Sequence, residues 1–597
     1  MDRKTILVLV ASIGALMLWP LLVGRLYPPI KMPISTNTLV TATNQAIAQS
    51  NTVTAAMTNL PAVPPITTNL VVAGTPEELL VLENENARYT FTSHGGGLKL
   101  VELIKYGEST CGGKTNAASQ KNATLNTRAP VPVGSLLGGE SIQGDGIFKL
   151  AKISPKLLRA EKSFTNGLYL VKDFQLSSNY LVVATVHLEN RGSQALFLPA
   201  HQFVIGTSTP LGPQDNLQLL GVDWFDGDKL QTADQTYFDN RTLGCIPGTP
   251  RDKYLMGNDN VVWASVHNQF FTVAVVPKEK APQLLAAPID LPPPSKEEQA
   301  ANTKTVAHPK GHQAALVYPA VKLDPAQKLD RQFLIFAGPK EYQTLAELGA
   351  QLNNKLDLVM GYSGFFGFFS KALLLSMNGL HSLLHVGYGW CIILITVIIK
   401  VLFWPLTQAS TRSMKRMSAL QPQMKALQEK FKDDPAKMNR KLMEFMKENK
   451  VSPLGGCLPM LLQIPVFFGF YRMIQSAIEL RGESFLWVCD LSKSDTLFFL
   501  PVLNFPVNPL PLLMGVTMLW QARLTPASPG VDPVQQKMMK YMPLMFLFIL
   551  YNFSAGLTLY WTVQNLLTIA QMKLTKTGGP AGAHGKAPTP VAPQRRK

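Results

Sequence analysis

Lys400 is the residue whose type and position most clearly could do chemistry. It interrupts an apolar segment and lies about ten residues after Trp390, or about 15 Å along a helix, which is near the middle of a bilayer. A lysine at that depth costs at least about 2.5–3.5 kcal/mol on insertion scales. Pro405 marks the inner end of the segment five residues on, so the lysine stem could extend towards the cytoplasm. The alternative is that the ammonium group faces a water-filled groove.

Other polar side chains interrupt the neighbouring apolar segments and could share such a groove. Thr396 precedes Lys400 by one helical turn, so the two lie on one helix face. Polar side chains at membrane depth also join helices to one another, and this alternative stays open for each residue. The predicted groove residues are Lys400, Thr396, Gln463, Thr517, Gln521, Trp561, Gln564, Asn565 and Thr568.

Apolar side chains on two of these segments could contact another apolar helix. The alternative is that they only pack in a core or face lipid. This predicted apolar slide consists of Leu461, Ile464, Phe467, Phe468, Met542, Phe546 and Ile549.

The sequence lacks the motifs of several enzyme classes. It contains no G-x-x-x-x-G-K-[ST] phosphate loop, no H-E-x-x-H pair and no paired carboxylates within the apolar segments. Its five cysteines, at 111, 245, 391, 457 and 489, show no C-x-x-C spacing. We therefore expect no enzyme activity, no cofactor and no metal. A disulfide between Cys111 and Cys245 is possible in an oxidising compartment, and the sequence leaves it open.

The first part of the chain is predicted to be a membrane anchor followed by a tether. Residues 5–24 form an uncharged apolar run of the length needed to cross about 30 Å of hydrocarbon. No A-x-A-like cleavage site follows, so residues 1–27 are interpreted as a retained signal-anchor. Residues 28–70 are rich in Pro, Thr, Asn and Ala, which is typical of a flexible linker.

Residues 71–345 have the pattern of residue types that is typical of a large exported β-sandwich domain. Runs rich in Val, Phe and Thr at 179–190, 261–277 and 328–338 predict strands, and turn residues separate them. The segment 281–312 is predicted to be a long polar loop.

The remainder is predicted to be helical and embedded in a membrane. Residues 346–385 end in an interfacial amphipathic helix, and 386–573 hold five transmembrane helices. These are expected at 388–408, 457–479, 508–523, 535–553 and 555–573. With the N-terminus inside, the count of crossings leaves both the basic segment 409–450 and the basic tail 574–597 in the cytoplasm. The excess of Lys+Arg over Asp+Glu, 56 against 39, includes these segments and agrees with that topology.

Residues 409–450 are predicted to form a helical hairpin. Its methionines, Met414, Met417, Met424, Met438 and Met446, lie in apolar stripes. We expect the two arms to pack against each other, and a Met-rich basic surface can also adapt to varied apolar partners. Asp434 and Pro435 supply an N-cap and a first helical residue for the second arm.

Long motifs in the last third of the chain resemble the YidC/Oxa family of membrane protein insertases. They include GYGWCIILITVIIKVLFWPLT, SMKRMSALQPQMKALQEKFKDD, VSPLGGCLPMLLQIPVFFGFYRMI, DPVQQKMMKYMPLMF and SAGLTLYWTVQNLLTIAQ. The exported part is similar through TFTSHGGGLKLVELIKY, WASVHNQFFTVAVVP and FAGPKEY. This combination resembles the Gram-negative form of the family.

The resemblance implies an α + β multidomain protein of the bacterial inner membrane. It would have a periplasmic β-supersandwich, a five-helix transmembrane insertase core and an extra N-terminal transmembrane anchor helix. Its expected partners are nascent membrane proteins, the Sec translocon with its accessory subunits, ribosome and targeting-particle components, and membrane lipids, but no DNA. The family usually has Arg at the position of Lys400, and Lys keeps the charge without the planar five-donor fork.

Two other kinds of function are alternatives to insertion. A secondary transporter would also keep a charge at mid-membrane, but it would be expected to show inverted repeats, which the five unequal core segments do not. A sugar-binding or enzymatic site in the exported domain is the other alternative. His94, His187 and Glu189 are its candidates by residue type, although a strand histidine is more often structural.

Overall fold

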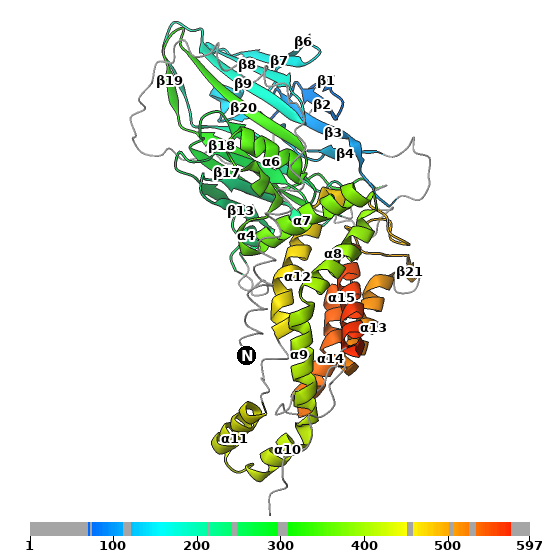
Figure 1. The fold of residues 1–597 in the computed structure, drawn as a ribbon. Coiled ribbons are helices and arrows are strands. Elements are labelled where there is room, and N and C mark those ends of the chain that lie inside the picture. The colour runs from blue at the N-terminus through cyan, green and yellow to red at the C-terminus, as the bar shows by residue number, and fades with distance from the viewer. Residues whose placement is uncertain are drawn as a thin grey trace, which may run out of the picture. The chain divides into compact units, whose positions relative to one another are not determined.

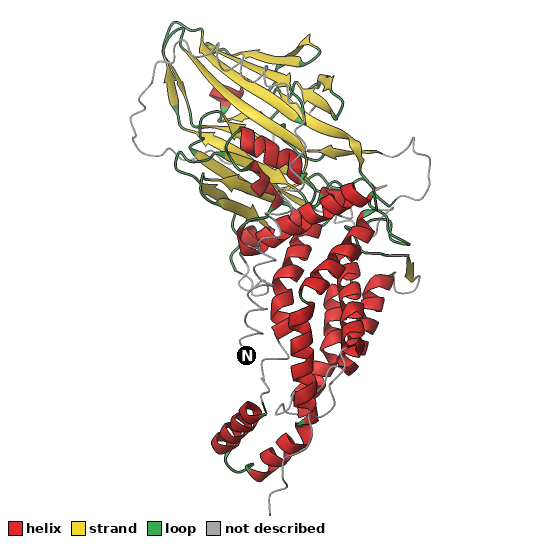
Figure 2. Cartoon of the chain, viewed as in Figure 1, coloured by secondary structure: helices red, strands yellow, loops and turns green. Residues whose placement is uncertain are grey.

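The computed structural model describes residues 70–71, 74–111, 121–212, 215–240, 248–296, 309–449, 458–500, 505–524 and 533–574. The predicted anchor, nearly all of the linker and nearly all of the basic tail lie outside these residues. The described chain forms two compact units. A β-rich unit lies within 28–368 and includes 475–481, and a helical unit is built from 369–474 and 482–597. Figure 2 shows the strands of the first unit in yellow and the helices of the second in red.

Antiparallel sheets form the body of the β-rich unit, in which a nine-stranded sheet packs on a five-stranded one. The nine-stranded sheet runs β13 (Leu230–Asp234), β12 (Gly221–Phe225), β15 (Trp263–His267), β16 (Phe271–Pro277), β20 (Lys328–Pro339), β9 (Leu181–Asn190), β8 (Leu168–Leu176), β7 (Leu157–Ser163) and β6 (Lys149–Ser154). The five-stranded sheet runs β14 (Tyr254–Met256), β17 (Gln283–Asp290), β18 (Lys310–Tyr318), β11 (His201–Ser208) and β5 (Leu136–Leu137). The chain begins with a four-stranded sheet of β1 (Leu79–Glu83), β2 (Ala87–Thr92), β3 (Gly97–Gly107) and β4 (Asn122–Leu125), and β10 (Leu196–Leu198) pairs with β19 (Val321–Leu323).

The predicted β-sandwich is confirmed, and the reason is visible in β9. Its side chains alternate between fully and partly buried, as a strand between two environments requires. Between the sheets, Phe203 of β11 and Phe333 of β20 stack with ring centroids 3.8 Å apart. The predicted strands at 179–190, 261–277 and 328–338 correspond to β9, to the pair β15 and β16, and to β20.

The prediction of a polar loop over 281–312 is wrong in part, because β17 lies inside the five-stranded sheet. Leu284, Leu285 and Ala286 are buried there and supply the apolar contacts that fix the strand. Pro288 does not interrupt it. Pro288 pairs with His312 of β18 on one side. On the other side, β14 pairs only with residues 284–286, so no strand there needs the N–H that proline lacks.

Short helices complete the β-rich unit, and α6 (Tyr342–Gln351) is the longest that lies wholly within it. The segment after α6 is tied to the sheet by Trp263, whose indole N–H donates to the carbonyl of Asn354 at 2.9 Å. The other short helices are α3 (Glu140–Gln143), α4 (Gln235–Asp239) and the 3₁₀ turns Leu217–Leu219, Leu356–Met360 and Ile478–Leu480.

The predicted helical region is confirmed as helical, and each of the five segments expected to span the membrane within 386–573 contains a helix (Figure 1). The helices are α7 (Gly364–Leu384), α8 (Tyr388–Leu402), α9 (Trp404–Ala419), α10 (Gln421–Lys430), α11 (Pro435–Glu448), α12 (Leu458–Ser476), α13 (Pro509–Leu524), α14 (Pro533–Leu550) and α15 (Ala555–Leu574). By length and hydropathy, none of the described helices could cross a membrane singly, whereas α7 and α8, bent by 116°, could do so as a pair. The number of crossings stays a prediction.

The segment expected as one helix over 388–408 is divided, since α8 ends at Leu402 and α9 begins at Trp404. Pro405 explains the division. Proline has no N–H to donate in a helix interior, but it is tolerated in the first turn, which is where α9 places it. The Phe403 N–H still donates to Ile399 at 3.0 Å, and the Thr407 N–H donates to Phe403 at 2.9 Å, so the backbone is satisfied on both sides of the break.

Of the five cysteines, Cys111 and Cys489 are both disulfide-bonded, and Cys391 is a buried free thiol that packs in α8. Cys245 and Cys457 lie outside the described residues, so the pair Cys111–Cys245 stays an open expectation.

Lys172 of β8 is fully buried and holds a glycine turn in place. Its Nζ donates to the carbonyls of Gly95 at 2.7 Å and Gly96 at 3.2 Å, and it lies 4.5 Å from the centroid of the Phe148 ring. Gly95 and Gly96 have positive φ, 74° and 55°, which glycine adopts without strain. Burial, with a smaller contribution from the cation of Lys162, lowers the pKa of Lys172 to about 7.

A pH dependence of stability follows from this shift. The ordinary lysine pKa of 10.5 lies above the folded value, so from about pH 7 to 10 the unfolded chain binds more protons and stability rises with pH. The rise from this one group is at most about 1.4 kcal/mol per pH unit. We expect Lys172→Met to lose that contribution and the exposed control Lys156→Met to keep it, as measured by urea unfolding at several pH values. Equal pH slopes in all three proteins would contradict the assignment.

Candidate functional site

Helix α15 is the polar centre of the helical unit, because side chains along it bond to α8, α9, α12 and α13. Thr568 accepts from Lys400 Nζ of α8 at 2.8 Å, and Asn565 donates to Thr517 of α13 at 3.2 Å. Gln564 donates to Gln463 of α12 at 3.3 Å. Six of the nine predicted groove residues are therefore joined pairwise around one helix.

Lys400 lies in the last turn of α8 and is only 6% exposed. Its acceptor is a neutral hydroxyl, and that hydroxyl in turn donates to the Gln564 carbonyl at 2.7 Å. Among the described residues, no carboxylate lies within ion-pair distance of Lys400. The partial negative charge at the C-terminal end of α8 favours a cation there. Within the described part of the chain, no acidic side chain pairs with the Lys400 ammonium group. The charge is thus held in place without being compensated.

The other two predicted groove threonines, like Thr568, donate their hydroxyl protons within their own helices. Thr396 is fully buried and donates to the Ile392 carbonyl at 2.6 Å, and Thr517 donates to the Met514 carbonyl at 2.8 Å. Thr517 still accepts from Asn565, whereas Thr396 serves its own helix. Gln521 is partly buried on α13.

A further polar pair was not predicted from the sequence. Gln571 of α15 is buried and donates to the Thr407 hydroxyl of α9 at 2.7 Å. The spacing of Gln564, Thr568 and Gln571, at i, i+4 and i+7, places them on one helix face and could have revealed it.

Trp561 connects the polar centre to the predicted apolar slide. Its ring meets Phe467 of α12 at 4.8 Å and Phe546 of α14 at 5.7 Å between centroids. Met542 is partly buried. The remaining members are exposed in the folded chain, namely Leu461, Ile464, Phe468 and Ile549.

The predicted hairpin consists of α9, α10 and α11, with α10 packed against α11. Met424 of α10 is buried in one cluster with Leu442 and Met446 of α11, as expected for arms that pack together. Met417 is also buried, whereas Met414 and Met438 are partly exposed.

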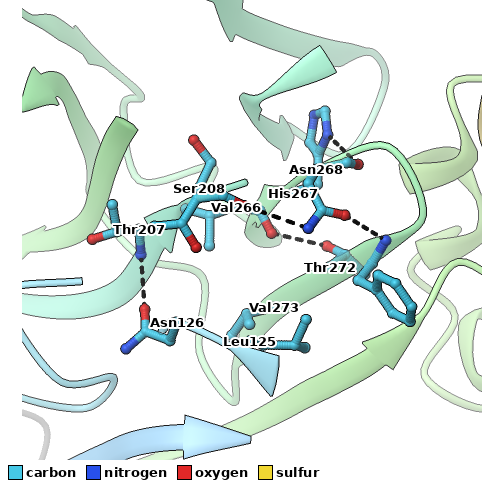
Figure 3. A pocket seen from close by; sticks show the side chains of 11 residues that line it. Leu125, Asn126, Thr207, Ser208, Val266, His267, Asn268, Thr272 and Val273 are labelled. Carbon is cyan, nitrogen blue, oxygen red and sulfur yellow. Dashed lines mark hydrogen bonds between the residues drawn. The ribbon is translucent and has the colours of Figure 1, made fainter. Parts of the chain in front are cut away.

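A small polar pocket lies in the β-rich unit between β11, β15 and β16 (Figure 3). His267 in its wall has Nε2 3.2 Å from the carboxylate of the buried Asp223, and its Nδ1 lies 3.1 Å from Lys340 Nζ. Burial lowers the pKa of Lys340 to about 8, and the Asp223 carboxylate limits the fall. Thr207, whose buried hydroxyl has no partner among the described residues, lines the same pocket.

The three residues considered for a sugar site do not surround this pocket. His187 pairs with Asp330 at 2.7 Å, and Glu189 pairs with Arg191 at 2.8 Å. His94 lies 3.2 Å from the Pro76 carbonyl. Each therefore has a local structural partner, and a ligand for them stays an untested expectation.

Comparison with known proteins identifies the family. A model of the 60Kd inner membrane protein matches residues 379–580, and a model of the YidC periplasmic domain matches residues 143–375. The membrane protein insertase YidC of Geotalea daltonii is 31% identical over 597 residues, covering 97% of this chain and 100% of that protein. This chain belongs to the YidC family. The YidC of Geobacter sulfurreducens is 33% identical over 497 residues, covering 81% and 83% of the two chains.

Solved structures resemble the chain more distantly. One described as an active YidC insertase, with its first transmembrane domain resolved, is 18% identical and covers 85% of this chain and 94% of that one, with a TM-score of 0.32. A galactose mutarotase related enzyme from Lactobacillus acidophilus covers 44% of this chain at 11% identity, with a TM-score of 0.30.

Membership in the YidC family establishes the general function. Its members are inner-membrane insertases with a periplasmic domain, and their clients are membrane proteins. The prediction that the chain is an insertase and not an enzyme is therefore confirmed.

The hairpin offers a local test of its capping. The Asp434 carboxylate accepts from the Lys437 N–H at 3.0 Å at the start of α11. Loss of an N-cap costs about 1 kcal/mol, so Asp434→Ala should speed amide exchange in the first turn of α11 about fivefold. Asp434→Asn keeps an acceptor and serves as the matched control. Hydrogen exchange on the intact protein measures both, and an unchanged rate in Asp434→Ala would show that the cap is dispensable.

Proposed function

We propose that this YidC-family insertase works through a hydrated cationic groove centred on Lys400 and open to the cytoplasm and the inner leaflet. The observation that carries the proposal is the uncompensated charge: Lys400 is 6% exposed and its acceptor is the neutral Thr568 hydroxyl. Keeping such a charge within the membrane is costly, so a site that keeps it without a carboxylate is suited to attract one from outside.

The groove lowers the barrier for a polar chain segment. An acidic or polar stretch of a nascent protein enters from the cytoplasm and approaches Lys400, while its apolar segment moves along α12 and α14. Contact of Trp561 with Phe467 and Phe546 supports a surface where polar and apolar walls meet. The apolar segment then partitions into lipid, which releases free energy, and the polar stretch leaves on the other side.

The other polar groups shape this groove. Gln463, Gln564, Asn565 and Thr517 already bond to one another in pairs. Such pairs can exchange partners with a passing backbone, because an amide side chain both donates and accepts hydrogen bonds. No residue in this site needs to break a covalent bond.

The proposed organisation of the whole chain follows the predicted topology. Residues 1–27 anchor the chain, 28–70 tether it, 71–345 form the periplasmic domain, and 346–385 lie at the interface. The core is 386–573 with its hairpin at 409–450. The basic hairpin and the tail 574–597 face the cytoplasm, where their charge suits ribosomal RNA and targeting components. We include work beside the Sec translocon and its accessory subunits in this proposal.

Charge reversal at Lys400 tests the proposal. Two unit charges about 6 Å apart at an effective dielectric constant of about 20 interact by about 3 kcal/mol, so Lys400→Glu turns attraction of an acidic segment into repulsion. We expect insertion of a client with an acidic translocated segment to fall at least tenfold, as measured in reconstituted proteoliposomes. Lys400→Arg should retain activity, because only the charge is required.

Two comparisons keep this test specific. Lys156→Glu makes the same change in net charge at an exposed residue of the β-rich unit and should insert clients normally. A client whose translocated segment is basic should not be impaired by Lys400→Glu. Normal insertion of the acidic client by a folded Lys400→Glu protein would rule out the charge role.

Crosslinking locates the client path. A photo-reactive amino acid at Gln564, which is only partly buried, should crosslink to a stalled nascent membrane protein. The same probe at Thr396, which is fully buried against its own helix, should crosslink weakly. Failure of Gln564 to crosslink in a correctly folded protein would argue against the groove.

A further inference from the structure

A short ribbon of two strands in the helical unit is apolar throughout. It consists of β21 (Phe498–Leu500) and β22 (Phe505–Val507), and we call it the apolar ribbon. The paired residues are Phe498 with Val507, Phe499 with Pro506, and Leu500 with Phe505. None of these six side chains carries a polar group.

Both faces of the apolar ribbon are open. Successive residues of a strand point to opposite faces, yet Phe498, Phe499 and Leu500 are all exposed, at 53%, 48% and 40%. Phe505 on the second strand is 45% exposed. A two-stranded ribbon in water is marginally stable and usually has one polar face. This composition therefore suits an apolar surrounding on both sides.

The ribbon is also fixed to the ends of two helices. The Tyr551 hydroxyl, just after α14, donates to the Pro506 carbonyl at 2.7 Å, and its ring stacks on Phe505 at 5.1 Å between centroids. Asn508, which directly precedes α13, is fully buried and donates to the Tyr551 carbonyl at 2.9 Å. Thr496 donates to the Asn508 side chain at 2.7 Å. Exposure of the apolar side chains is thus maintained by a polar clamp at the base of the ribbon.

The length of α13 indicates what covers the ribbon. Its 16 residues measure about 24 Å, which is shorter than the roughly 30 Å hydrocarbon core of a bilayer. Helix α13 also exposes apolar side chains, at Leu512, Leu513 and Val516. A three-residue strand adds about 10 Å of apolar length at the N-terminal end of the helix, beside which Figure 1 shows β21.

We propose that the apolar ribbon is immersed in the bilayer at the N-terminal end of α13, with lipid as its occupant. There it extends the apolar surface of a helix that is too short to cross alone. Its phenylalanines lie at the boundary between acyl chains and headgroups, where apolar and aromatic side chains hold a segment at a defined depth. The ribbon is thereby a lipid anchor for the segment between α12 and α13. This role does not depend on the Lys400 groove.

Nitroxide accessibility in nanodiscs tests the proposal on the full chain. A spin label is attached through a genetically encoded keto amino acid at Phe498, and in a second variant at Leu500. The matched control carries the label at Phe197, an aromatic residue of β10 that is 71% exposed in the β-rich unit. Collision rates are measured with oxygen, which concentrates in lipid, and with a nickel chelate, which stays in water.

We expect a several-fold higher ratio of oxygen to nickel collisions at Phe498 and Leu500 than at Phe197. Equal ratios would place the ribbon in water and overturn the proposal. Low collision rates with both reagents would show that protein covers the ribbon, either a second copy or another part of this chain, and would overturn it as well. Insertion activity, measured separately on the unlabelled protein, reports on the groove and does not enter this result.

Discussion

A polar side chain inside a helical bundle must find a hydrogen-bond partner there, and α15 concentrates this requirement. Its Gln564, Asn565 and Thr568 reach α12, α13 and α8 respectively. Each bond requires a particular rotation and height of the neighbouring helix, because an unpaired polar group in an apolar interior costs several kcal/mol. The bundle therefore has one helix whose polar face fixes the register of the others. The position of Lys400 is a consequence of that arrangement.

The arrangement satisfies Lys400 without neutralising it. A hydroxyl acceptor orients an ammonium group but leaves its charge, whereas a carboxylate would cancel the field that a client could sense. This distinction separates a structural cation from a functional one. The same distinction is consistent with a lysine in place of an arginine at position 400. A point charge attracts acidic segments of any geometry, whereas the guanidinium group favours bidentate partners. Insertion of many unrelated clients favours such undemanding recognition.

The β-rich unit also contains buried lysines, and their surroundings differ from those of Lys400. Lys172 is buried against the carbonyls of Gly95 and Gly96, where a backbone turn has oxygens that no strand can satisfy. Lys340 is buried beside His267 and Asp223, so its charge is partly matched. These lysines have acceptors of their own within the unit, whereas Lys400 is held by a single hydroxyl. Buried lysines in this chain thus differ in what surrounds them, and the proposed role of Lys400 in attracting clients rests on that difference.

The sequence alone determined the β-sandwich class of one described unit, the helical class of the other, and the family. Periodicity and turn residues are local properties, so the strands around 181–190 and 328–339, the helices of the last third and the Asp434 cap were predictable. Long motifs carried the family, and the depth predicted for Lys400 rests on its spacing to Trp390. Local signals failed at β17, because the proline-rich and charged run that follows it, 291–299, led to a loop prediction for the whole of 281–312. In β17 the strand is held by partners that are distant in the sequence.

Only the tertiary structure decided which polar residues act together. Thr396 and Thr568 are both predicted groove residues and both donate to their own helices, yet only Thr568 also accepts from Lys400. Gln571 was overlooked because its partner, Thr407, lies 164 residues away. Likewise, the sequence did not single out the two short strands Phe498–Leu500 and Phe505–Val507, whose exposed apolar side chains only the structure shows. Hydrogen-bond pairing and burial depend on contacts between distant segments, and a linear pattern of residue types does not contain them.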